Sequence, residues 1–271
     1  MLSQPRIRLH HLSHFRAFER YICMASVLFK QTSSSKRFIR RALTDPYGKS
    51  RASAMGQPTY VARSAHKLIQ LDQQLGLFPR RGGPTRVVDL GAAPGGWTEV
   101  VLERLNKVPC KDDKLHCVIA CDLLPLDRSI RSKVSEKIKL HTIHGDFNNP
   151  IIQAEVKSHL DSVHADIKSH SQIGPTIILS DMLPPITGIS IKDTQGSFDL
   201  CMAVAHLARN YIRADDPLPN VLVLKHLQSG LTEELKKSLM MDWKQVKWIK
   251  PLASRSESRE GYFVVRDRKQ N

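Results

Sequence analysis

The sequence predicts an α/β fold with a mostly parallel sheet that helices cover on both faces. Strand-like apolar runs alternate with helical segments over most of the chain. One of these runs, Val87-Val88-Asp89-Leu90, passes through a turn of small residues into a helix. The last two strand-like runs are joined by a polar loop without a helix. Because short connections favour antiparallel pairing, we expect one strand to run against the others.

The first half of the fold is predicted from five segments. Helical spacing of apolar residues indicates a helix over Val61–Leu75. An apolar run over Thr85–Leu90 indicates a strand, and the small-residue turn then leads into a helix over Trp97–Asn106. Two further strand-like runs cover Leu115–Asp122 and Ile138–His144.

The middle of the chain continues the alternation. A polar helix is expected over Ile151–Ser162, followed by the His- and Ser-rich stretch His164–Gly174, which we interpret as a surface excursion. A strand over Thr176–Ser180, a long helix over Gly196–Ile212 and a strand over Asn220–His226 follow.

The end of the chain completes one domain. A helix over Thr232–Met240 precedes strands over Gln245–Ile249 and Tyr262–Val265. With 271 residues, of which 41% are hydrophobic, the chain can bury one large core. We therefore expect a single domain over residues 54–271. No apolar run is long enough to span a membrane, and the protein is expected to be a monomer.

The cysteine pattern does not indicate a disulfide framework or a metal site. The five cysteines are odd in number and lack the CxxC spacing of structural zinc sites. Cys117 and Cys121 lie four residues apart on a predicted strand, hence on one face, where we expect them to be buried as small apolar side chains. A reducing compartment is consistent with this pattern.

Residues 1–53 form a basic leader. They contain eleven lysines and arginines, but only Glu19 and Asp45 as acids, within a chain of net charge +15. Apolar residues are mixed with the arginines and serines. This composition is typical of a mitochondrial transit peptide, so we predict the mitochondrial matrix as the location. A basic arm that contacts nucleic acid is the alternative. Residues 45–58 are predicted to be a linker.

A glycine-rich turn follows the strand that ends at Leu90. It contains Gly91, Ala92, Ala93, Pro94, Gly95 and Gly96. Small side chains let a ligand approach the backbone closely. In open α/β sheets, ligands bind beyond the carboxyl ends of the strands, where this turn is expected. The turn therefore predicts a nucleotide-like cofactor.

Acids follow the other predicted strands at the same edge. Asp122 is placed to accept hydrogen bonds from ribose hydroxyls. Asp146 could accept from an exocyclic amine, and Phe147 could cover an adenine face. Asp181 ends the next strand. Taken alone, each acid is more often a helix cap or a turn residue than a ligand contact, but their shared position favours a cofactor crevice.

The charge pattern of the turn favours S-adenosylmethionine. The turn lacks the GxGxxG fingerprint of dinucleotide sites, and Trp97 stands where a Walker loop has lysine. Residues 87–99 contain no cation, whereas Asp89 suits a positively charged ligand such as a sulfonium. An NAD-dependent oxidoreductase remains an alternative, opposed by the missing fingerprint.

Four motifs together resemble the FtsJ/RrmJ family of RNA ribose 2′-O-methyltransferases. They are Asp89–Trp97, Cys121–Pro125, Gly145–Phe147 and Ser180–Met182, in the family's order and spacing. The resemblance covers residues 60 to 266. It implies the class I S-adenosylmethionine-dependent methyltransferase fold, which is Rossmann-like and has a seven-stranded sheet with one antiparallel strand. The expected cofactor contacts are Asp89, Gly91, Ala93, Pro94, Gly95, Gly96, Trp97, Asp122, Leu123, Asp146, Phe147 and Asp181.

The resemblance also implies a catalytic tetrad of Lys67, Asp181, Lys225 and Glu260. Three departures from the family pattern affect the surrounding loops. His226 replaces an apolar residue, the segment 216–219 replaces a glycine pair, and the segment 184–188 lacks the usual asparagine.

The residue types of the tetrad suit methylation of a hydroxyl. A ribose 2′-hydroxyl must lose its proton as it attacks the sulfonium methyl group. A lysine can accept that proton only when its own amine is neutral, which burial or a neighbouring cation favours. We expect Lys225 to be the base and Lys67 to be the neighbouring cation or a substrate contact. Asp181 would orient Lys225, and Glu260 would orient Lys67 or the hydroxyl; no metal is required.

The expected substrate is a structured RNA. Compact size and the leader resemble the mitochondrial branch of the family, which modifies a uridine of large-subunit rRNA, free or in an assembling subunit. Methylation of tRNA and a non-catalytic role in ribosome assembly are the alternatives. Basic side chains that could contact phosphates are Arg63, Lys192, Arg255 and Arg259, with Lys236, Lys237, Lys244, Lys247 and Lys250 as a second set.

Overall fold

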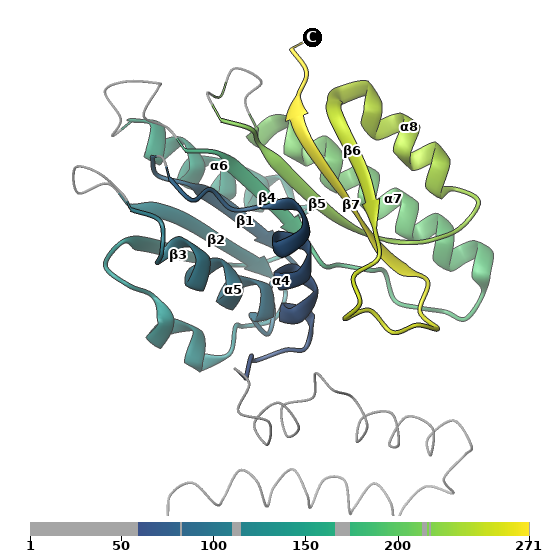
Figure 1. Ribbon diagram of the computed structural model, residues 1–271, viewed down its shortest axis with the longest axis horizontal. Helices are drawn as coiled ribbons and strands as arrows, with labels where there is room; N and C mark the ends of the chain where they lie inside the picture. The colour runs from purple at the N-terminus through teal and green to yellow at the C-terminus, as the bar shows by residue number, and fades with distance from the viewer. Residues whose placement is uncertain are drawn as a thin grey trace, which may run out of the picture.

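The computed structural model describes residues 59–81, 83–109, 115–165, 174–212, 216 and 218–270. The leader and its linker, Cys23, Cys110 and most of the expected excursion over residues 164–174 lie outside the described residues. Figure 1 shows the ribbon. Its elements are α4 (Ser64–Leu75), β1 (Arg86–Leu90), α5 (Gly96–Leu105), β2 (His116–Asp122), the 3₁₀ helix η1 (Arg128–Lys133), β3 (Ile138–His144), α6 (Pro150–Ala165), β4 (Thr176–Ser180), α7 (Ser190–Tyr211), β5 (Val221–Leu227), α8 (Thr232–Asp242), β6 (Trp243–Ile249) and β7 (Glu260–Arg268).

The strands form one seven-stranded sheet in the order β3-β2-β1-β4-β5-β7-β6. The strands β1 to β5 pair in parallel, and β7 is inserted antiparallel between β5 and β6. The prediction of a mostly parallel seven-stranded sheet with one antiparallel strand is therefore confirmed.

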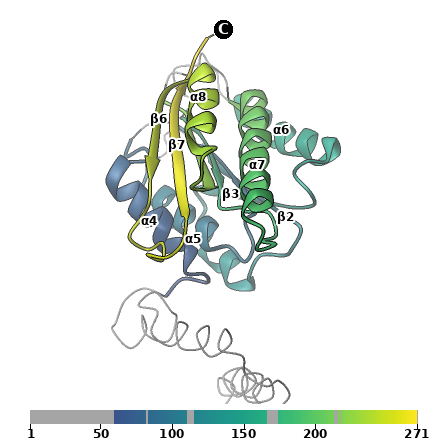
Figure 2. The ribbon, with the colours of Figure 1, turned by 90° about the vertical axis from the view of Figure 1, so that its right-hand side faces the viewer.

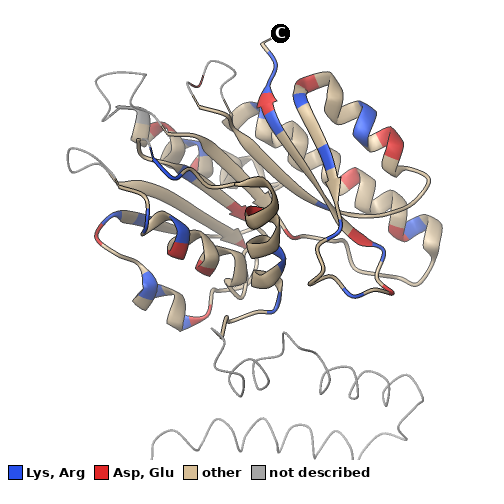
Figure 3. Ribbon diagram, viewed as in Figure 1, with Lys and Arg blue, Asp and Glu red and all other residues tan. Residues whose placement is uncertain are grey.

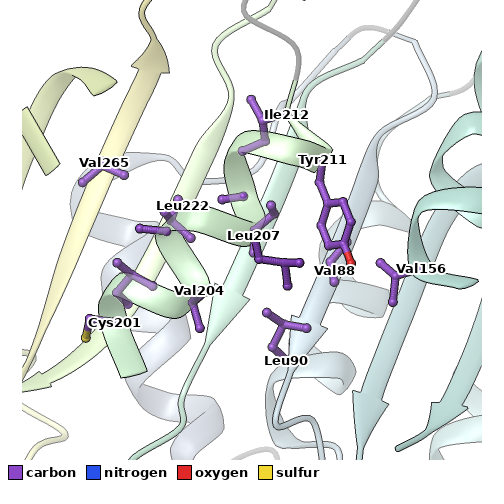
Figure 4. Packing of buried hydrophobic residues seen from close by; sticks show 14 of the residues in the cluster. Val88, Leu90, Val156, Cys201, Val204, Leu207, Tyr211, Ile212, Leu222 and Val265 are labelled. Carbon is purple, nitrogen blue, oxygen red and sulfur yellow. The ribbon is translucent and has the colours of Figure 1, made fainter. Parts of the chain in front are cut away.

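Helices cover both faces of the sheet. Figure 2 shows α4 and α5 on one side, and α6, α7 and α8 on the other. Because both faces are covered, the central strands β1 and β4 are buried along their whole length. Figure 4 shows one of the two cores, in which Leu207 and Tyr211 of α7 pack beside Val88 and Leu90 of β1.

The long helix α7 begins at Ser190, not at the predicted Gly196. Glycine in a helix interior lowers helix propensity, which made Gly196 look like a boundary. In the fold, a side chain at position 196 would bring its Cβ to 3.2 Å from Pro184 Cγ. The glycine therefore lets the helix pass close to the loop that leaves β4.

The last strand is also longer than predicted. β7 starts at Glu260 and ends at Arg268, whereas the sequence indicated only the apolar part, Tyr262–Val265. Pairing with β5 on one side and β6 on the other extends it into polar residues. Glu260 is thus a strand residue, and its side chain lies on the same face as Tyr262, two residues on.

The cysteines of β2 behave as small apolar residues. Cys117 and Cys121 are both buried and free, as predicted, and belong to the core beneath α6 and α7. Burial raises the pKa of each thiol to about 11. None of the helices in the described ranges is both long and apolar enough to cross a bilayer.

Candidate active site

The glycine turn between β1 and α5 is compact at two positions. Gly91 has φ +73°, and a Cβ there would lie 2.2 Å from Met182 Cγ, which is a severe clash. Gly95 has φ +116°, which disfavours any other residue, and a Cβ would meet Ile130. The peptide bond between Ala93 and Pro94 is cis. A larger residue at either glycine would displace the turn.

The carboxylate of Asp122 holds this turn against the end of β2. Its Oδ2 accepts from the amide of Ala93 at 2.8 Å, and its Oδ1 accepts from the amide of Leu124 at 2.8 Å. Each carboxylate oxygen can accept a second hydrogen bond, so Asp122 keeps the capacity to bind the ribose hydroxyls as predicted. Leu123, which lies between Asp122 and Leu124 in the chain, is 62% exposed.

The loop after β3 lies beside the loop after β2. The amide of Gly145 donates to the carbonyl of Asp122 at 3.0 Å. Asp146 is exposed and accepts at Oδ1 from the amide of Asn148 at 2.9 Å. Phe147 is half-buried and packs against the core. The fold thus brings these two predicted cofactor contacts next to Asp122.

A cavity of about 530 Å³ adjoins these loops on the η1 side of the sheet. It extends from the ends of β2 and β3 to η1, and its lining combines apolar side chains with polar ones at the strand ends. Apolar members include Leu124, Leu126 and Ile130, and polar members include Asp122 and His144. Its size and its mixture of side chains suit part of a nucleoside.

Asp89 does not project into the crevice. The residue is 1% exposed, and its Oδ2 accepts from the hydroxyl of Thr98 at 2.7 Å. Burial, together with the charges of Asp181 and Asp122, raises the pKa of Asp89 to about 7, although the bond from Thr98 lowers it. The predicted influence of Asp89 on a cationic ligand is therefore electrostatic in this structure.

The Trp97 side chain is a packing residue rather than a surface of the crevice. It is 2% exposed, and its Nε1 donates to the carbonyl of Ser64 in α4 at 2.9 Å. Its ring lies 5.7 Å from the ring of Tyr262. Gly96 permits this docking, because a Cβ there would lie 2.9 Å from the Cβ of Ala62.

The four predicted catalytic residues form two ion pairs. Lys225 Nζ lies 2.9 Å from Asp181 Oδ1 and also donates to the Asp181 carbonyl at 2.6 Å. Lys67 Nζ lies 2.9 Å from Glu260 Oε2. Each lysine side chain is about 10% exposed, and the side chains of Asp181 and Glu260 are 15% and 27% exposed. The tetrad is thus largely desolvated, yet reachable from solvent.

Tyr262 connects the two ion pairs and was missed by the sequence analysis. Its hydroxyl donates to Asp181 Oδ1 at 2.6 Å, and Lys67 Nζ lies 5.9 Å from its ring centroid. Tyr262 is opposite Lys225 in the β5–β7 register, which explains why both side chains reach one carboxylate. Burial and the Asp181 charge raise the pKa of Tyr262 well above its usual value. The sequence does carry a signal for Tyr262. If the strand is extended back to Glu260, the alternation of side chains puts Tyr262 on the same face as Glu260.

Basic neighbours favour the ionised form of Glu260 by lowering its pKa. Burial alone would raise the pKa of its carboxyl group, but Lys67, and more weakly Lys225 and Arg255, lower it below the usual value. The influence of both lysines on one carboxylate places the two ion pairs in a single cluster of alternating charge.

A second cavity, of about 380 Å³, opens onto this cluster. Its lining residues are Arg63, Lys67, Arg255, Glu257, Ser258 and Glu260. Arg255 and Glu257 come from the loop between β6 and β7, which carries blue and red positions at the lower right of Figure 3. The cavity is therefore a charged mouth in which two arginines lie next to the tetrad.

The predicted phosphate contacts divide into a near and a distant set. Arg63 and Arg255 line the cavity, and Arg259 reaches Ser190 Oγ at 3.3 Å. In the second set, Lys250 binds the carbonyls of the β6–β7 loop, and Lys236 lies 3.9 Å from a glutamate. Lys192 is exposed near the first set; Lys237, Lys244 and Lys247 are exposed on α8 and β6.

The three departures from the family pattern are structural. His226 is fully buried, lies 3.1 Å from Ser197 Oγ and 3.2 Å from Thr232 Oγ1, and has its pKa lowered by burial to about 4. Asp216 forms a buried ion pair with Arg86 at 3.0 Å. The segment 184–188 forms a turn on the Asp193 carboxylate. Among the described residues, no side-chain hydrogen bond or ion pair joins any of the three to the tetrad.

Comparisons with known proteins agree with this geometry. Residues 60–268 match the FtsJ-like methyltransferase family. "Ribosomal RNA large subunit methyltransferase E" of Granulibacter bethesdensis is 31% identical over 90% of both chains. The protein of that name from Hyphomonas neptunium is 35% identical over 87% of this chain and 84% of its own. A Plasmodium falciparum structure, provisionally assigned as a ribosomal RNA methyltransferase, has a TM-score of 0.57 and 26% identity, covering 78% of this chain and all of that one.

Replacement of Asp89 by asparagine is expected to stabilise the cofactor-free protein. Folding raises the pKa of this carboxyl group from about 4 to about 7, so ionisation penalises the folded state increasingly between those values and fully above them. The melting temperature of Asp89→Asn should therefore exceed that of the parent by a margin that grows from about pH 5 to about pH 7 and then stays constant.

The same variant should bind S-adenosylmethionine less well relative to S-adenosylhomocysteine, because a negative charge near the sulfonium is lost. Calorimetry with both ligands measures the ratio of the affinity for S-adenosylmethionine to the affinity for S-adenosylhomocysteine. In the parent this affinity ratio should also fall as the pH drops below about 7, because Asp89 becomes protonated. Asp161→Asn, on the exposed face of α6, is the control. A melting-temperature margin that is independent of pH would contradict the assignment.

Proposed function

Because this chain belongs to the FtsJ-like methyltransferase family, whose methyl donor is S-adenosylmethionine, we propose that it methylates a ribose 2′-hydroxyl of RNA. The observation that carries the proposal is the single cluster formed by Lys67, Asp181, Lys225 and Glu260. It lies at the mouth of a cavity lined by arginines and beside the glycine turn. A hydroxyl acceptor attached to a phosphate backbone fits that mouth.

The residues at the carboxyl edge fit the methyl donor. Backbone groups of the glycine turn, the carboxylate of Asp122 and the loop at Asp146 would hold its amino-acid and adenosine parts, and Asp89 and Asp181 contribute negative charge. When bound, the donor supplies an electrophilic methyl group on a sulfonium. The acceptor would approach from the side of the tetrad, because Asp181 pairs with Lys225 and is followed by Met182, which lies against Gly91 of the turn.

We assign proton removal to Lys225. Its Nζ is held by two oxygens of Asp181, which fixes its direction. Lys67 brings a second lysine into the same cluster through its ion pair with Glu260. Loss of one proton from Lys225 leaves a lone pair for the 2′-hydroxyl, while the carboxylates keep both amines in place.

We further propose that the substrate is a uridine of large-subunit rRNA. The bacterial relatives are named for the large-subunit ribosomal RNA, and they match this chain along most of its length. For the same reason rRNA is preferred here to tRNA as the substrate.

The basic composition of residues 1–53 supports a mitochondrial location. The rRNA would then be that of the organelle. This step depends on the leader alone and is independent of the chemistry.

The base assignment predicts that Lys225→Arg is inactive. Arginine keeps a positive charge near Asp181 but does not deprotonate near neutral pH. Methyl transfer to in vitro transcribed large-subunit rRNA, followed by mapping of ribose methylation, should be lost, while binding of S-adenosylhomocysteine stays within about twofold of the parent. Lys157→Arg, on the exposed face of α6 and likewise paired with an aspartate, is the matched control. Turnover by the Lys225→Arg variant would show that a fixed charge suffices and that Lys225 is not the base.

Tyr262→Phe should lower kcat by about ten- to a hundredfold, since a hydrogen bond to a charged group is worth roughly 1.5–3 kcal/mol. The aromatic ring and its packing against Trp97 are retained, so binding of S-adenosylhomocysteine should not change. The pH profile of kcat should shift, because Asp181 loses a donor that competes with Lys225. Tyr211→Phe, which loses a hydrogen bond to the Gln153 carbonyl far from the site, should leave kcat unchanged. Equal loss in both variants would indicate general destabilisation.

The leader predicts organellar import. A fusion of residues 1–53 to a fluorescent protein should accumulate in mitochondria, as judged by co-localisation with a matrix marker. Replacing its arginines by glutamine should abolish import, because transit peptides depend on positive charge. Diffuse or nuclear fluorescence of the unchanged fusion would refute the location without affecting the proposed chemistry.

A further inference from the structure

Three exposed isoleucines follow the catalytic Asp181 in the chain. Ile186, Ile189 and Ile191 are 60%, 62% and 83% exposed. Single exposed apolar residues are common on protein surfaces, but three large ones in one short segment make that segment a candidate contact surface. We call these three residues the apolar ridge.

The backbone that carries the ridge is held in one conformation. The Asp193 carboxylate accepts from the Thr187 amide at 2.8 Å, from its hydroxyl at 2.6 Å and from the Gly188 amide at 3.0 Å. Gly188 has φ +84°, which the turn requires. Hydrogen bonds from Thr187 lower the pKa of Asp193, so the carboxylate remains ionised and keeps these bonds. A preformed surface loses little conformational entropy when it binds.

The ridge is linked to the basic side of the site. Ser190 lies between two of the isoleucines, and its hydroxyl is 3.3 Å from the Arg259 guanidinium. Arg259 directly precedes Glu260 of the tetrad, and Arg255 lines the charged cavity. Lys192, next to Ile191, is exposed. Apolar side chains and cations therefore share one surface beside the catalytic cluster.

We propose that the apolar ridge contacts unpaired bases of the RNA next to the target nucleotide. This inference rests on the proposed RNA substrate. Among ligands that suit a cationic surface, nucleic acids present apolar base faces directly beside anionic phosphates. Isoleucine and leucine side chains act as wedges between bases in other nucleic-acid complexes. Unpaired segments of RNA are also where bases can be splayed apart and a ribose exposed.

The ridge and the arginines would then have different tasks. Arg63, Arg255 and Arg259 hold phosphates and bind any RNA, whereas the ridge selects a segment whose bases are unstacked. A perfect duplex buries its base faces and would gain nothing from the ridge.

The test compares the parent with the triple variant Ile186→Ser, Ile189→Ser, Ile191→Ser. The probes are a fluorescent hairpin RNA with an unpaired loop and a fluorescent perfect duplex of the same length, both titrated by anisotropy. The Kd for the hairpin should rise about tenfold, which corresponds to about 1.4 kcal/mol. The Kd for the duplex should not change. The slope of log Kd against log salt should also stay constant, because no cation has been removed.

Two control variants separate the ridge from general effects. Replacing the three isoleucines by leucine keeps the apolar surface and should retain hairpin binding. Met241→Ser removes a side chain that is 72% exposed at the end of α8, where the next residue, Asp242, pairs with Arg209 near the far end of α7, and should change nothing.

The proposal is overturned if the triple serine variant binds the hairpin as tightly as the parent. It is also overturned if hairpin and duplex lose affinity equally, or if the salt slope falls. Failure of the proposed function has a different signature: the parent would bind the hairpin through the ridge, but no RNA would acquire a methyl group.

Discussion

The carboxylate of Asp181 is the interaction on which the site depends. One of its oxygens receives the Lys225 ammonium from β5 and the Tyr262 hydroxyl from β7, so three adjacent strands meet at a single acceptor. The antiparallel insertion of β7 makes this possible, because it places Tyr262 directly opposite Lys225. The same strand brings Glu260 to Lys67, two residues before Tyr262. The antiparallel position of β7 in the sheet therefore determines the geometry of both ion pairs.

Trp97 couples the cofactor side of the site to the acceptor side. The indole belongs to the helix that opens after the glycine turn, donates to α4 and packs on Tyr262. α4 in turn carries Lys67. A displacement of the turn would therefore be transmitted through one buried ring to both ion pairs. Buried, close-packed side chains are suited to this because they resist small displacements.

The sequence predicted most strands of the sheet and four residues that the fold brings into one cluster, but it was insufficient where tertiary contacts override local patterns. The apolar runs of β1, β2, β4 and β5 reveal their strands because these strands are buried on both faces. β7 was predicted too short because its ends are polar and are ordered only by two neighbouring strands, and Tyr262 was missed for that reason. Asp89 was expected at the cofactor, but its contact with Thr98 could be seen only once α5 was placed against β1. Gly196 was interpreted as a helix boundary because the sequence pattern does not reveal that residue 196 packs closely against Pro184, which requires a glycine inside the helix.

The two sides of the site differ in charge in a way that suits two different ligands. Asp89, Asp122 and Asp181 lie at the ends of adjacent strands, and burial, together with the charges of Asp181 and Asp122, raises the pKa of Asp89. Such a crevice favours a cationic donor. Beyond Asp181 the tetrad balances its own charges, and the nearby arginines then make the surface favourable for a polyanion. Methyl transfer converts a sulfonium into a neutral thioether, so the acids that favour the donor do not favour its product. The separation of charge therefore helps both to bind the donor and to release what remains of it.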